Sequence, residues 1–412
     1  MKIKLIVIAG LLLINFLGGG CASTRDFDDC LNSIVEPYRF SIAKWESVAI
    51  LREVNRWISN SYTKSDDEVH TVIEHFSFIE QIKTLKSEVQ AINAGNRQGD
   101  PATLEAELNR LQEQKMALED VVEKIIEGQI RETLAQKGIF NPVDKYIRLE
   151  VGFPPVNFEL EKPPSLLVIS PRHKIESMIE ILLLRNLDLK EIEDIEAKVD
   201  KLGVSSLVVE IGGLGATYPT FVTNEGSLRF TIDTATEEWL HQYLVFKPLG
   251  FLYLLDLTGV SRDYEIATMN ETLASMVSKE IGSMVCAKYY SEYVNDGNQA
   301  AESGFDFNQE MREIRKTVDK YLAKGEIEQA EEYMEQKRQY LASMGYYIRK
   351  LNQAYFAYHG TYADRLTSIS PIGLELKELR SQSVSLKDFL NKVAVMTSRQ
   401  DLRDSIESES ER

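Results

Sequence analysis

The spacing of apolar residues along the chain changes several times, and each change predicts a different kind of element. Between residues 70 and 137, apolar residues recur at steps of three and four, as on the seam of a coiled coil. The turn-forming stretch 93–101 divides this region and ends in Pro101, which suits the first turn of a helix. We therefore predict an antiparallel helical hairpin. It either packs on the body of the protein or acts as an arm that binds a protein partner.

After the hairpin, prolines and alternating patterns predict a small sheet. Six prolines lie between residues 138 and 175 and exclude long helices there. A helix is expected over 173–200, followed by strands at 207–211 and 228–232 with a glycine-rich turn between them. The chain is thus predicted to be α+β and mostly helical, with a small sheet.

The remaining sequence is predicted to be helical, except at its polar end. Residues 26–62 and 308–356 have helical patterns, and Gly325 and Gly345 are expected to interrupt the second of these regions. The expected regions are an export signal at 1–20, an N-terminal helical segment at 21–69, the coiled-coil hairpin at 70–137, a core at 138–300, a C-terminal helical lobe at 301–400 and a disordered tail at 401–412.

The N-terminus has the features of an export signal. Two lysines precede the apolar run 5–17, and three glycines lead to Cys21. This arrangement resembles a bacterial lipoprotein signal, in which Cys21 becomes the lipid-modified first residue. An uncleaved anchor is the alternative, because residues 5–22 approach the length that spans a bilayer. Both interpretations place the body in the bacterial cell envelope, outside the cytoplasm, attached to the membrane by an N-terminal lipid or helix.

Composition and charge exclude some partners. The chain has 412 residues, of which 43% are hydrophobic and 27% charged, as expected for a folded body. Its formal net charge of -17 should repel nucleic acid and anionic lipid, so we expect no nucleic-acid partner. Beyond Cys21, Cys30 and Cys286 either form a disulfide or are two buried thiols.

Candidate chemistry is concentrated in two short segments. On a helix, Glu237 and His241 lie on the same face, with Glu238 about 100° round from Glu237. A metal ion held by Glu237 and His241 would keep a water molecule within reach of Glu238 as a base. Glu271, at the start of the next predicted helix, is the best candidate for a third ligand. If the site exists, these ligand atoms should converge within about 4 Å of one point.

Together the segments Thr236–His241 and Asn270–Ala274 resemble the gluzincin zinc metallopeptidases, which include thermolysin and the M1 aminopeptidases, and in particular a bacterial membrane-associated, aminopeptidase-like group. In gluzincins H-E-x-x-H supplies two zinc ligands and the base, and N-E-x-x-[AS] supplies the third ligand. Here Glu237 replaces the first histidine. The resemblance implies a thermolysin-like core that binds Zn²⁺ and hydrolyses peptides or proteins.

The resemblance also implies roles for residues outside the two motifs. Gluzincins use tyrosine and histidine groups to stabilise the oxyanion of the tetrahedral intermediate. Here Tyr362 and His359 are the first candidates for that role, ahead of Tyr355 and Tyr358. The predicted strand 228–232 would correspond to the edge strand that aligns the peptide substrate in such enzymes.

A purely structural interpretation competes with the metal site. Thr234 and Thr268 each lie three residues before a glutamate, so Glu237 and Glu271 fit the capping-box pattern of a helix start. Moreover, two carboxylates and one imidazole would make zinc a weaker Lewis acid and shift the preference towards manganese or calcium. Two functions therefore stay open: an active zinc metallopeptidase, or an inactive peptidase-like lipoprotein that binds a peptide or an envelope protein.

Overall fold

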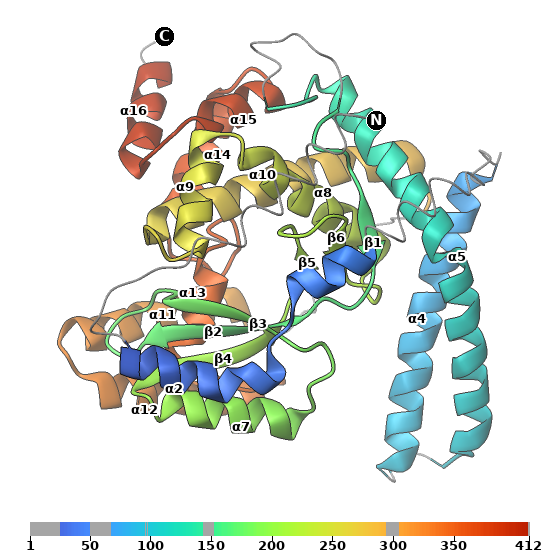
Figure 1. The fold of residues 1–412 in the computed structure, drawn as a ribbon, viewed down its shortest axis with the longest axis horizontal. Helices are drawn as coiled ribbons and strands as arrows, with labels where there is room; N and C mark the ends of the chain where they lie inside the picture. The colour runs from blue at the N-terminus through green and yellow to red at the C-terminus, as the bar shows by residue number, and fades with distance from the viewer. Residues whose placement is uncertain are drawn as a thin grey trace.

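The computed structural model describes residues 25–49, 67–94, 96, 98–142, 152–293 and 305–410. Within these residues the chain is mostly helical, with two three-stranded sheets (Figure 1). The predicted fold class, α+β and mostly helical, is confirmed at this level. The predicted export signal at 1–20 and Cys21 lie outside the described residues. Among the helices of the described part, none has the length and apolar character needed to cross a bilayer.

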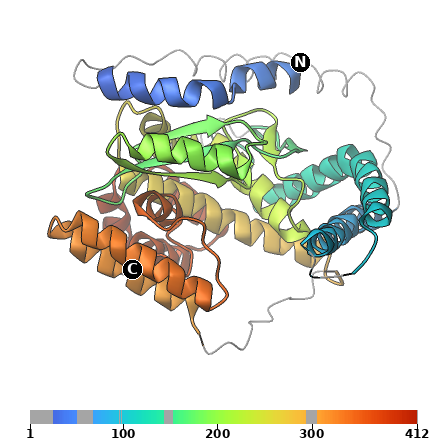
Figure 2. The same cartoon turned by 90° about the horizontal axis from the view of Figure 1, so that it is seen from below.

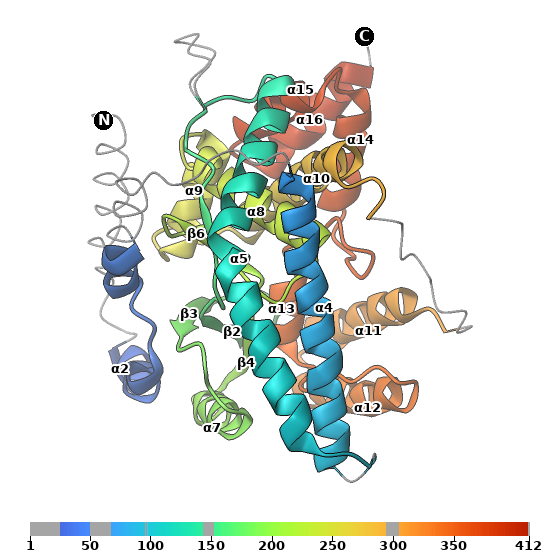
Figure 3. The same cartoon turned by 90° about the vertical axis from the view of Figure 1, so that its right-hand side faces the viewer.

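The predicted helical hairpin is present. Helices α4 (Glu68–Asn93) and α5 (Pro101–Gln136) run side by side along the molecule (Figure 3). Asp100 caps α5, because its carboxylate accepts from Ala102 N at 3.1 Å, and Pro101 is the first helical residue, as predicted. The second half of α5 contributes Ile126 and Ile130 to the main hydrophobic core. The hairpin thus packs on the body, and a protein partner for it stays a prediction.

The larger sheet has three antiparallel strands. Strand β2 (Ser165–Pro171) is central and fully buried, between β3 (Ile179–Leu183) and β4 (Val204–Glu210). The expected helix over 173–200 is wrong in its first half, because the apolar run that forms β3 pairs with β2. Only the second half is helical, in α7 (Leu189–Asp200), which begins at a capping box formed by Asp188 and Glu191.

Helices cover both faces of this sheet. Helices α7 and α2 (Arg25–Val35) pack on one face, which presents Leu167 and Ile169. Helix α13 (Gln353–Gly360) packs on the other face through Ala354. Figure 2 shows the blue α2 on the opposite side of the molecule from the orange α11 and α12. Of the predicted N-terminal helical region, the described part forms α2, the 3₁₀ turn η2 (Glu36–Tyr38) and a helix at 42–49.

The smaller sheet leads into the region of the predicted chemistry. Strand β1 (Phe158–Leu160) runs parallel to β6 (Thr220–Val222), and β6 pairs antiparallel with the short edge strand β5 (Gly213–Leu214). Strand β5 lies against the helix that follows β6. The glycine-rich turn of the sequence is therefore partly an edge strand, placed beside the motif helix.

The predicted strand at 228–232 is wrong, because these residues begin a helix, α8 (Leu228–Leu244). Ser227 caps α8 by accepting from Phe230 N at 3.3 Å, and Arg229 pairs with Asp233 one turn later at 2.8 Å. The alternation of apolar and polar residues at 228–232 suits a strand, but Leu228, Thr231 and Ile232 are buried at helical spacing.

Two helices follow α8. Helix α9 (Pro248–Leu257) begins at Pro248, and α10 (Tyr264–Tyr289) begins after Asp263, whose side chain accepts from Glu265 N and Ile266 N. Helix α10 is largely buried in the main core and packs on α8, α9 and α5. Cys286 is buried on α10 and forms no disulfide with Cys30, which is exposed on α2.

The C-terminal part of the chain is divided between two cores. Helices α11 (Phe307–Ala323) and α12 (Ile327–Ser343) form a separate apolar cluster with α13. Helices α14 (Ile372–Gln382), α15 (Leu386–Ala394) and α16 (Arg399–Ser410) join the main core instead. The predicted breaks are confirmed, since Gly325 and Gly345 follow α11 and α12 with φ of 76° and 90°.

The expected disordered tail at 401–412 is wrong as far as residue 410. These residues belong to α16, and its Leu402 is fully buried in the main core. Asp401 accepts hydrogen bonds from Thr397 N and Ser398 N at the start of the helix. Ile406 packs beside Leu402, and ion pairs from Arg399 and Glu409 to α14 and α15 add to these contacts, so the polar segment is held on the body.

Candidate metal centre

The three predicted ligands come together between two helices. Glu237 and His241 lie on α8, and Glu271 lies on α10, which packs closely against α8 because Ala274 and Gly282 are small. One ligand atom from each residue lies within 4.8 Å of the other two, so all three lie within about 2.8 Å (4.8/√3) of a common point. The predicted convergence is confirmed, and the distance to that point is close to zinc–ligand lengths of about 2.0–2.2 Å.

The capping interpretation of these glutamates is wrong. Helix α8 begins at Leu228 after the cap residue Ser227, so Glu237 lies well inside the helix, where backbone N–H groups already bond within it. Helix α10 is likewise capped by Asp263, and Thr268 Oγ1 donates to Tyr264 O instead of capping a helix start. Glu237 and Glu271 are therefore free of any role at a helix N-terminus.

The orientation of His241 is fixed by the residue before the third ligand. His241 Nδ1 lies 3.0 Å from Asn270 Oδ1, and an amide oxygen can only accept. Nδ1 therefore carries the proton, and Nε2 presents its lone pair 3.7 Å from Glu271 Oε2. A histidine ligand held by its second nitrogen in this way is the usual arrangement in metal sites. The sequence motif includes Asn270, but only the structure shows this contact.

Glu271 has one satisfied oxygen and one that is not. Its side chain is 8% exposed, and Oε1 accepts a short hydrogen bond from the Tyr253 hydroxyl on α9. Oε2, the atom that faces His241, is buried and has no hydrogen-bond partner in the described part of the chain. Buried polar atoms rarely lack a partner, so this oxygen is suited to a bound cation. Sequence reasoning missed Tyr253, since nothing in its local sequence marks it.

The electrostatics of the cluster also favour a cation. Burial, reinforced by the charge of Glu271, raises the pKa of Glu237 to about 8. Burial, with the charges of Glu237 and Glu271, raises the pKa of Glu238 well above its usual value. Carboxylates this close cannot all ionise unless a positive charge lies among them. Two carboxylates and one imidazole can thus hold a metal ion, and the imidazole argues against calcium, which takes oxygen ligands.

Glu238 lies against the glycines of β5 and the turn after it. The backbone N–H of Gly215 favours the charged form of the Glu238 carboxylate, although burial outweighs it. A Cβ on Gly215 would lie 2.8 Å from Glu238 Oε2, and a Cβ on Gly213 would clash with Oε1 and with Thr234. Glycine is therefore required at both positions for this carboxylate to keep its place. The sequence shows the glycines but not the side chain they accommodate.

All four motif residues line one large cavity. Its volume is about 1170 Å³, in the range of ligand-binding cavities, and its wall also includes β5 and the phenylalanines Phe230 and Phe246. Among the oxyanion candidates, Tyr362 and Tyr358 line this cavity. Burial and the nearby carboxylates raise the pKa of Tyr362 well above its usual value, so its hydroxyl stays protonated and can donate.

The structure places His359 and Tyr355 elsewhere. Both line a second cavity and not the one that holds Glu238 and His241. His359 Nδ1 lies 3.1 Å from Arg365 Nη1. His359 therefore does not line the cavity of Glu238 and His241, and its role at an oxyanion stays a prediction. One turn of helix separates it from Tyr355, whose ring lies 4.3 Å away.

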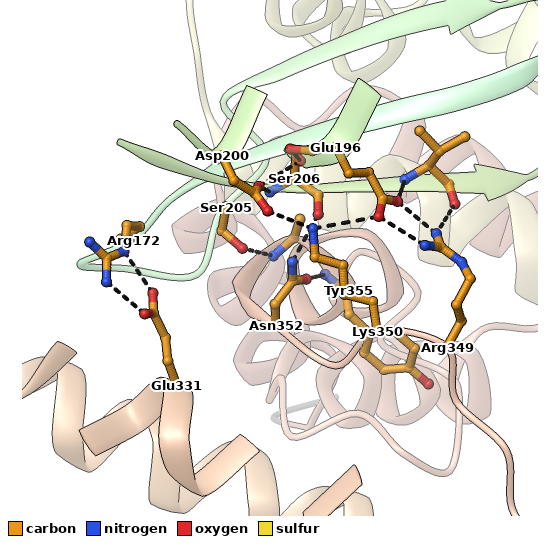
Figure 4. A network of polar contacts seen from close by, with 12 residues as sticks. Arg172, Glu196, Asp200, Ser205, Ser206, Glu331, Arg349, Lys350, Asn352 and Tyr355 are labelled. Carbon is orange, nitrogen blue, oxygen red and sulfur yellow. Dashed lines mark hydrogen bonds and ion pairs between the residues drawn. The ribbon is translucent and has the colours of Figure 1, made fainter. Parts of the chain in front are cut away.

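A network of polar contacts joins the segment before α13 to α7 and to β4 of the larger sheet (Figure 4). Arg349 donates to both oxygens of Glu196 at 2.6 and 2.8 Å, and Lys350 pairs with Asp200 at 2.8 Å. Asn352 caps α13 by accepting from Tyr355 N, while its amide donates to the backbone of β4 at 2.8 Å. These contacts position the segment that carries Tyr358 and Tyr362 over the cavity.

Comparison of the chain with protein-family models, with curated proteins and with solved structures found no match in any of the three.

Proposed function

We propose that this protein is a zinc metallopeptidase of the gluzincin type, with a thermolysin-like core. The observation that carries the proposal is the convergence of Glu237, His241 and Glu271 beside Glu238 in one cavity, with the Nε2 lone pair of His241 set by Asn270. A helix that carries two ligands and a base, packed on a helix that carries the third ligand, is the arrangement that the motifs imply.

The chemistry divides between the metal and the chain. Zinc, when bound, lowers the pKa of a water molecule and polarises the carbonyl oxygen of the substrate. The Glu238 carboxylate, which lies against Gly213 and Gly215, accepts the proton of the attacking water and transfers it to the leaving amine nitrogen. Tyr253 and Asn270 position Glu271 and His241 through hydrogen bonds and do not touch the substrate.

The cavity wall supplies the remaining parts of a peptidase site. Strand β5 pairs with β6 on one side only and lines the cavity, so an extended peptide can add to its other edge. This assigns to β5 the substrate-aligning role expected of residues 228–232. The Tyr362 hydroxyl, with Tyr358 beside it, donates to the oxyanion of the tetrahedral intermediate.

The substrates are peptides or proteins outside the cytoplasm. The N-terminal sequence supports this location, because two lysines, an apolar run and Cys21 follow the pattern of a lipoprotein signal. The lipid on Cys21 would attach the enzyme to the membrane of the bacterial cell envelope.

Metal analysis of the purified chain, together with a peptide-cleavage assay, tests the proposal. We expect about one zinc per chain, cleavage of peptides from a mixed library, and loss of cleavage with a chelator that zinc reverses. His241→Ala should lose the zinc, whereas removal of the exposed acid in Glu225→Gln should not. Absence of bound metal, or cleavage that is indifferent to the chelator, would overturn the proposal.

Glu237 favours a second candidate function. An anionic ligand in place of histidine makes bound zinc a weaker Lewis acid, and Glu238 next to it adds negative charge. A lipoprotein that binds zinc and peptides without cleaving them would use the same cavity, and the hairpin could then serve to bind an envelope partner. Zinc binding and peptide binding without any cleavage would favour this candidate.

A further inference from the structure

A second cavity lies next to the one that holds the metal centre. Its volume is about 630 Å³, and its wall is formed by the start of α10, by α11 and α13, and by residues 365–372. Tyr264 and Arg365 line both cavities and form the wall between them. The wall of the second cavity carries more positive than negative charge, whereas the whole chain has a net charge of -17. Its charged residues are three arginines and one glutamate: Arg315, Arg365, Arg399 and Glu265.

Arg365 has no carboxylate partner among the residues that the structure describes. Its Nη1 contacts His359 Nδ1 at 3.1 Å, and its guanidinium lies over the Tyr362 ring, 4.3 Å from the centroid. The other N–H groups of a guanidinium, which carries five in all, have no such contact. Arg365 is exposed, so these N–H groups are open to an anion that enters the cavity, while stacking on Tyr362 limits the movement of the guanidinium.

His359 adds a second donor to this wall. Burial, with the charge of Arg365, lowers the pKa of His359 to about 4, so the ring is neutral near pH 7. Because Arg365 can only donate, Nδ1 of His359 accepts, and Nε2 carries the hydrogen. Ser368 offers a further donor: its Oγ accepts a hydrogen bond from Ser370 N at 3.1 Å, and its hydroxyl hydrogen can donate to a ligand.

The other two arginines are rigid. Arg315 is held by Asp319 at 3.1 Å, and Asp319 does not line the cavity. Arg399 is held by Glu375 at 2.8 Å and by Glu265 of the cavity wall at 2.9 Å, so Arg365 is the arginine of this wall that has no carboxylate partner among the described residues. The N-terminus of α14, whose cap residue Pro371 makes no side-chain bond, lies in the same wall. The positive end of α14 therefore lies beside the arginines of this wall.

We propose that this second cavity binds the phosphate group of a small molecule, with Arg365 and His359 as its principal donors. Donors that approach from α13, from α14 and from the 365–370 loop suit a tetrahedral group that accepts on all sides, whereas a planar carboxylate needs only one fork. The cavity is larger than a phosphate ion, so it has room for the organic part of a phosphate monoester. The site needs no zinc and does not depend on peptidase activity.

Calorimetric titration of the full chain tests this proposal. Inorganic phosphate and glycerol phosphate are titrated at constant ionic strength into the His241→Ala protein, so that zinc cannot bind them. We expect at least one of the two compounds to bind at one site per chain. The compound that binds more tightly shows whether the site prefers free phosphate or a phosphate monoester. Arg365→Gln should weaken binding at least about tenfold, and His359→Phe should weaken it less.

A matched variant and a second anion make the result decisive. Arg338→Gln removes a partly exposed arginine of α12 that pairs with Glu335 on its own helix and does not line the cavity, and it should leave phosphate affinity unchanged. Arg365→Lys should bind more weakly than the parent protein, because the fork is lost although the charge is kept. Failure of both phosphates to bind, equal affinity for succinate, or unchanged affinity in both Arg365→Gln and His359→Phe would each overturn the proposal.

Discussion

Two buried glutamates of this molecule lie in opposite chemical settings. Glu196, on α7, is 3% exposed, and both of its carboxylate oxygens accept from Arg349, while Oε1 also accepts from Val208 N at 2.7 Å (Figure 4). Glu271, on α10, is 8% exposed and has one oxygen bonded to Tyr253 and one without a hydrogen bond. We call the first carboxylate closed, because protein groups donate to both of its oxygens. We call the second open, because one of its oxygens has no donor.

The number of hydrogen bonds made within the protein distinguishes these two glutamates more clearly than burial does, because both are buried. A buried ion pair with all its hydrogen bonds made joins two parts of the fold, here the larger sheet and the segment that leads to α13. A buried oxygen without a partner costs free energy unless a ligand completes it. Glu271, Glu237 and Glu238 form such an open cluster, with no arginine or lysine hydrogen-bonded to them among the described residues.

The largest expected effect comes from removing the proposed base of the open cluster. Glu238→Gln should lower the rate of peptide cleavage about 10³-fold, because a positioned general base contributes about 10²–10⁴-fold. Zinc content and the melting temperature should not fall, since Glu238 is not a ligand. Cleavage assays with metal analysis measure both, and Glu225→Gln on the surface is the control. A Glu238→Gln enzyme of undiminished rate would remove this residue from the reaction.

Removing the closed carboxylate of Glu196 should lower stability and leave catalysis unaffected. Glu196→Ala removes the acceptor of the partly exposed Arg349 guanidinium and of the buried Val208 N–H, so we expect the free energy of unfolding to fall by about 3 kcal/mol. Chemical denaturation measures it. The exposed pair formed by Glu335 and Arg338 on α12 is the control, and Glu335→Ala should cost no more than about 1 kcal/mol. Equal losses in the two variants would contradict the distinction between closed and exposed ion pairs.

His75, on α4, is a third kind of buried polar group. Its side chain is fully buried, and neither ring nitrogen has a hydrogen bond within the described residues. Burial, with a contribution from the charge of Lys115, lowers its pKa from 6.5 to about 4. The unfolded chain therefore takes up a proton at a higher pH than the folded chain does. The free energy of unfolding should fall by up to about 3 kcal/mol as the pH falls from about 6.5 to about 4.

His75→Leu isolates this contribution. Leucine keeps the volume and cannot bind a proton, so the loss of stability between pH 6.5 and 4 should be smaller in the variant by about the same amount. Denaturation curves at several pH values compare the two proteins. A pH dependence that is the same in both would mean that other groups cause the acid lability.

The smallest expected effect concerns the altered ligand. Glu237→His restores the usual H-E-x-x-H ligands and should tighten zinc binding about tenfold, as imidazole replaces a carboxylate whose pKa is raised by burial and by Glu271. Competition with a chromophoric chelator measures the affinity. Glu237→Gln is the control and should weaken it. If histidine weakens zinc binding as much as glutamine does, position 237 does not face the metal.

Local sequence was enough for the elements whose signals are local. The Asp100-Pro101 start of α5 and the glycines after α11 and α12 work through neighbouring backbone groups, and each prediction is confirmed. The predictions that failed concern segments whose structure depends on residues distant in the sequence. Residues 179–183 form a strand only because β2 pairs with them, and Leu402 holds α16 only because the main core receives it.

Glu271 joins Glu237 and His241 only because α10 packs on α8. By itself, the sequence determined that Glu237 and His241 share a face, because residues four apart on a helix do so wherever that helix lies. It also specified Glu238 beside that face. Tertiary structure alone decided the rest: that Asn270 orients His241, that β5 rather than 228–232 borders the base, and that His359 faces another cavity. These contacts join elements that are far apart in the sequence, and only the packing of α8, α9, α10 and α13 brings such groups within a few ångströms of one another.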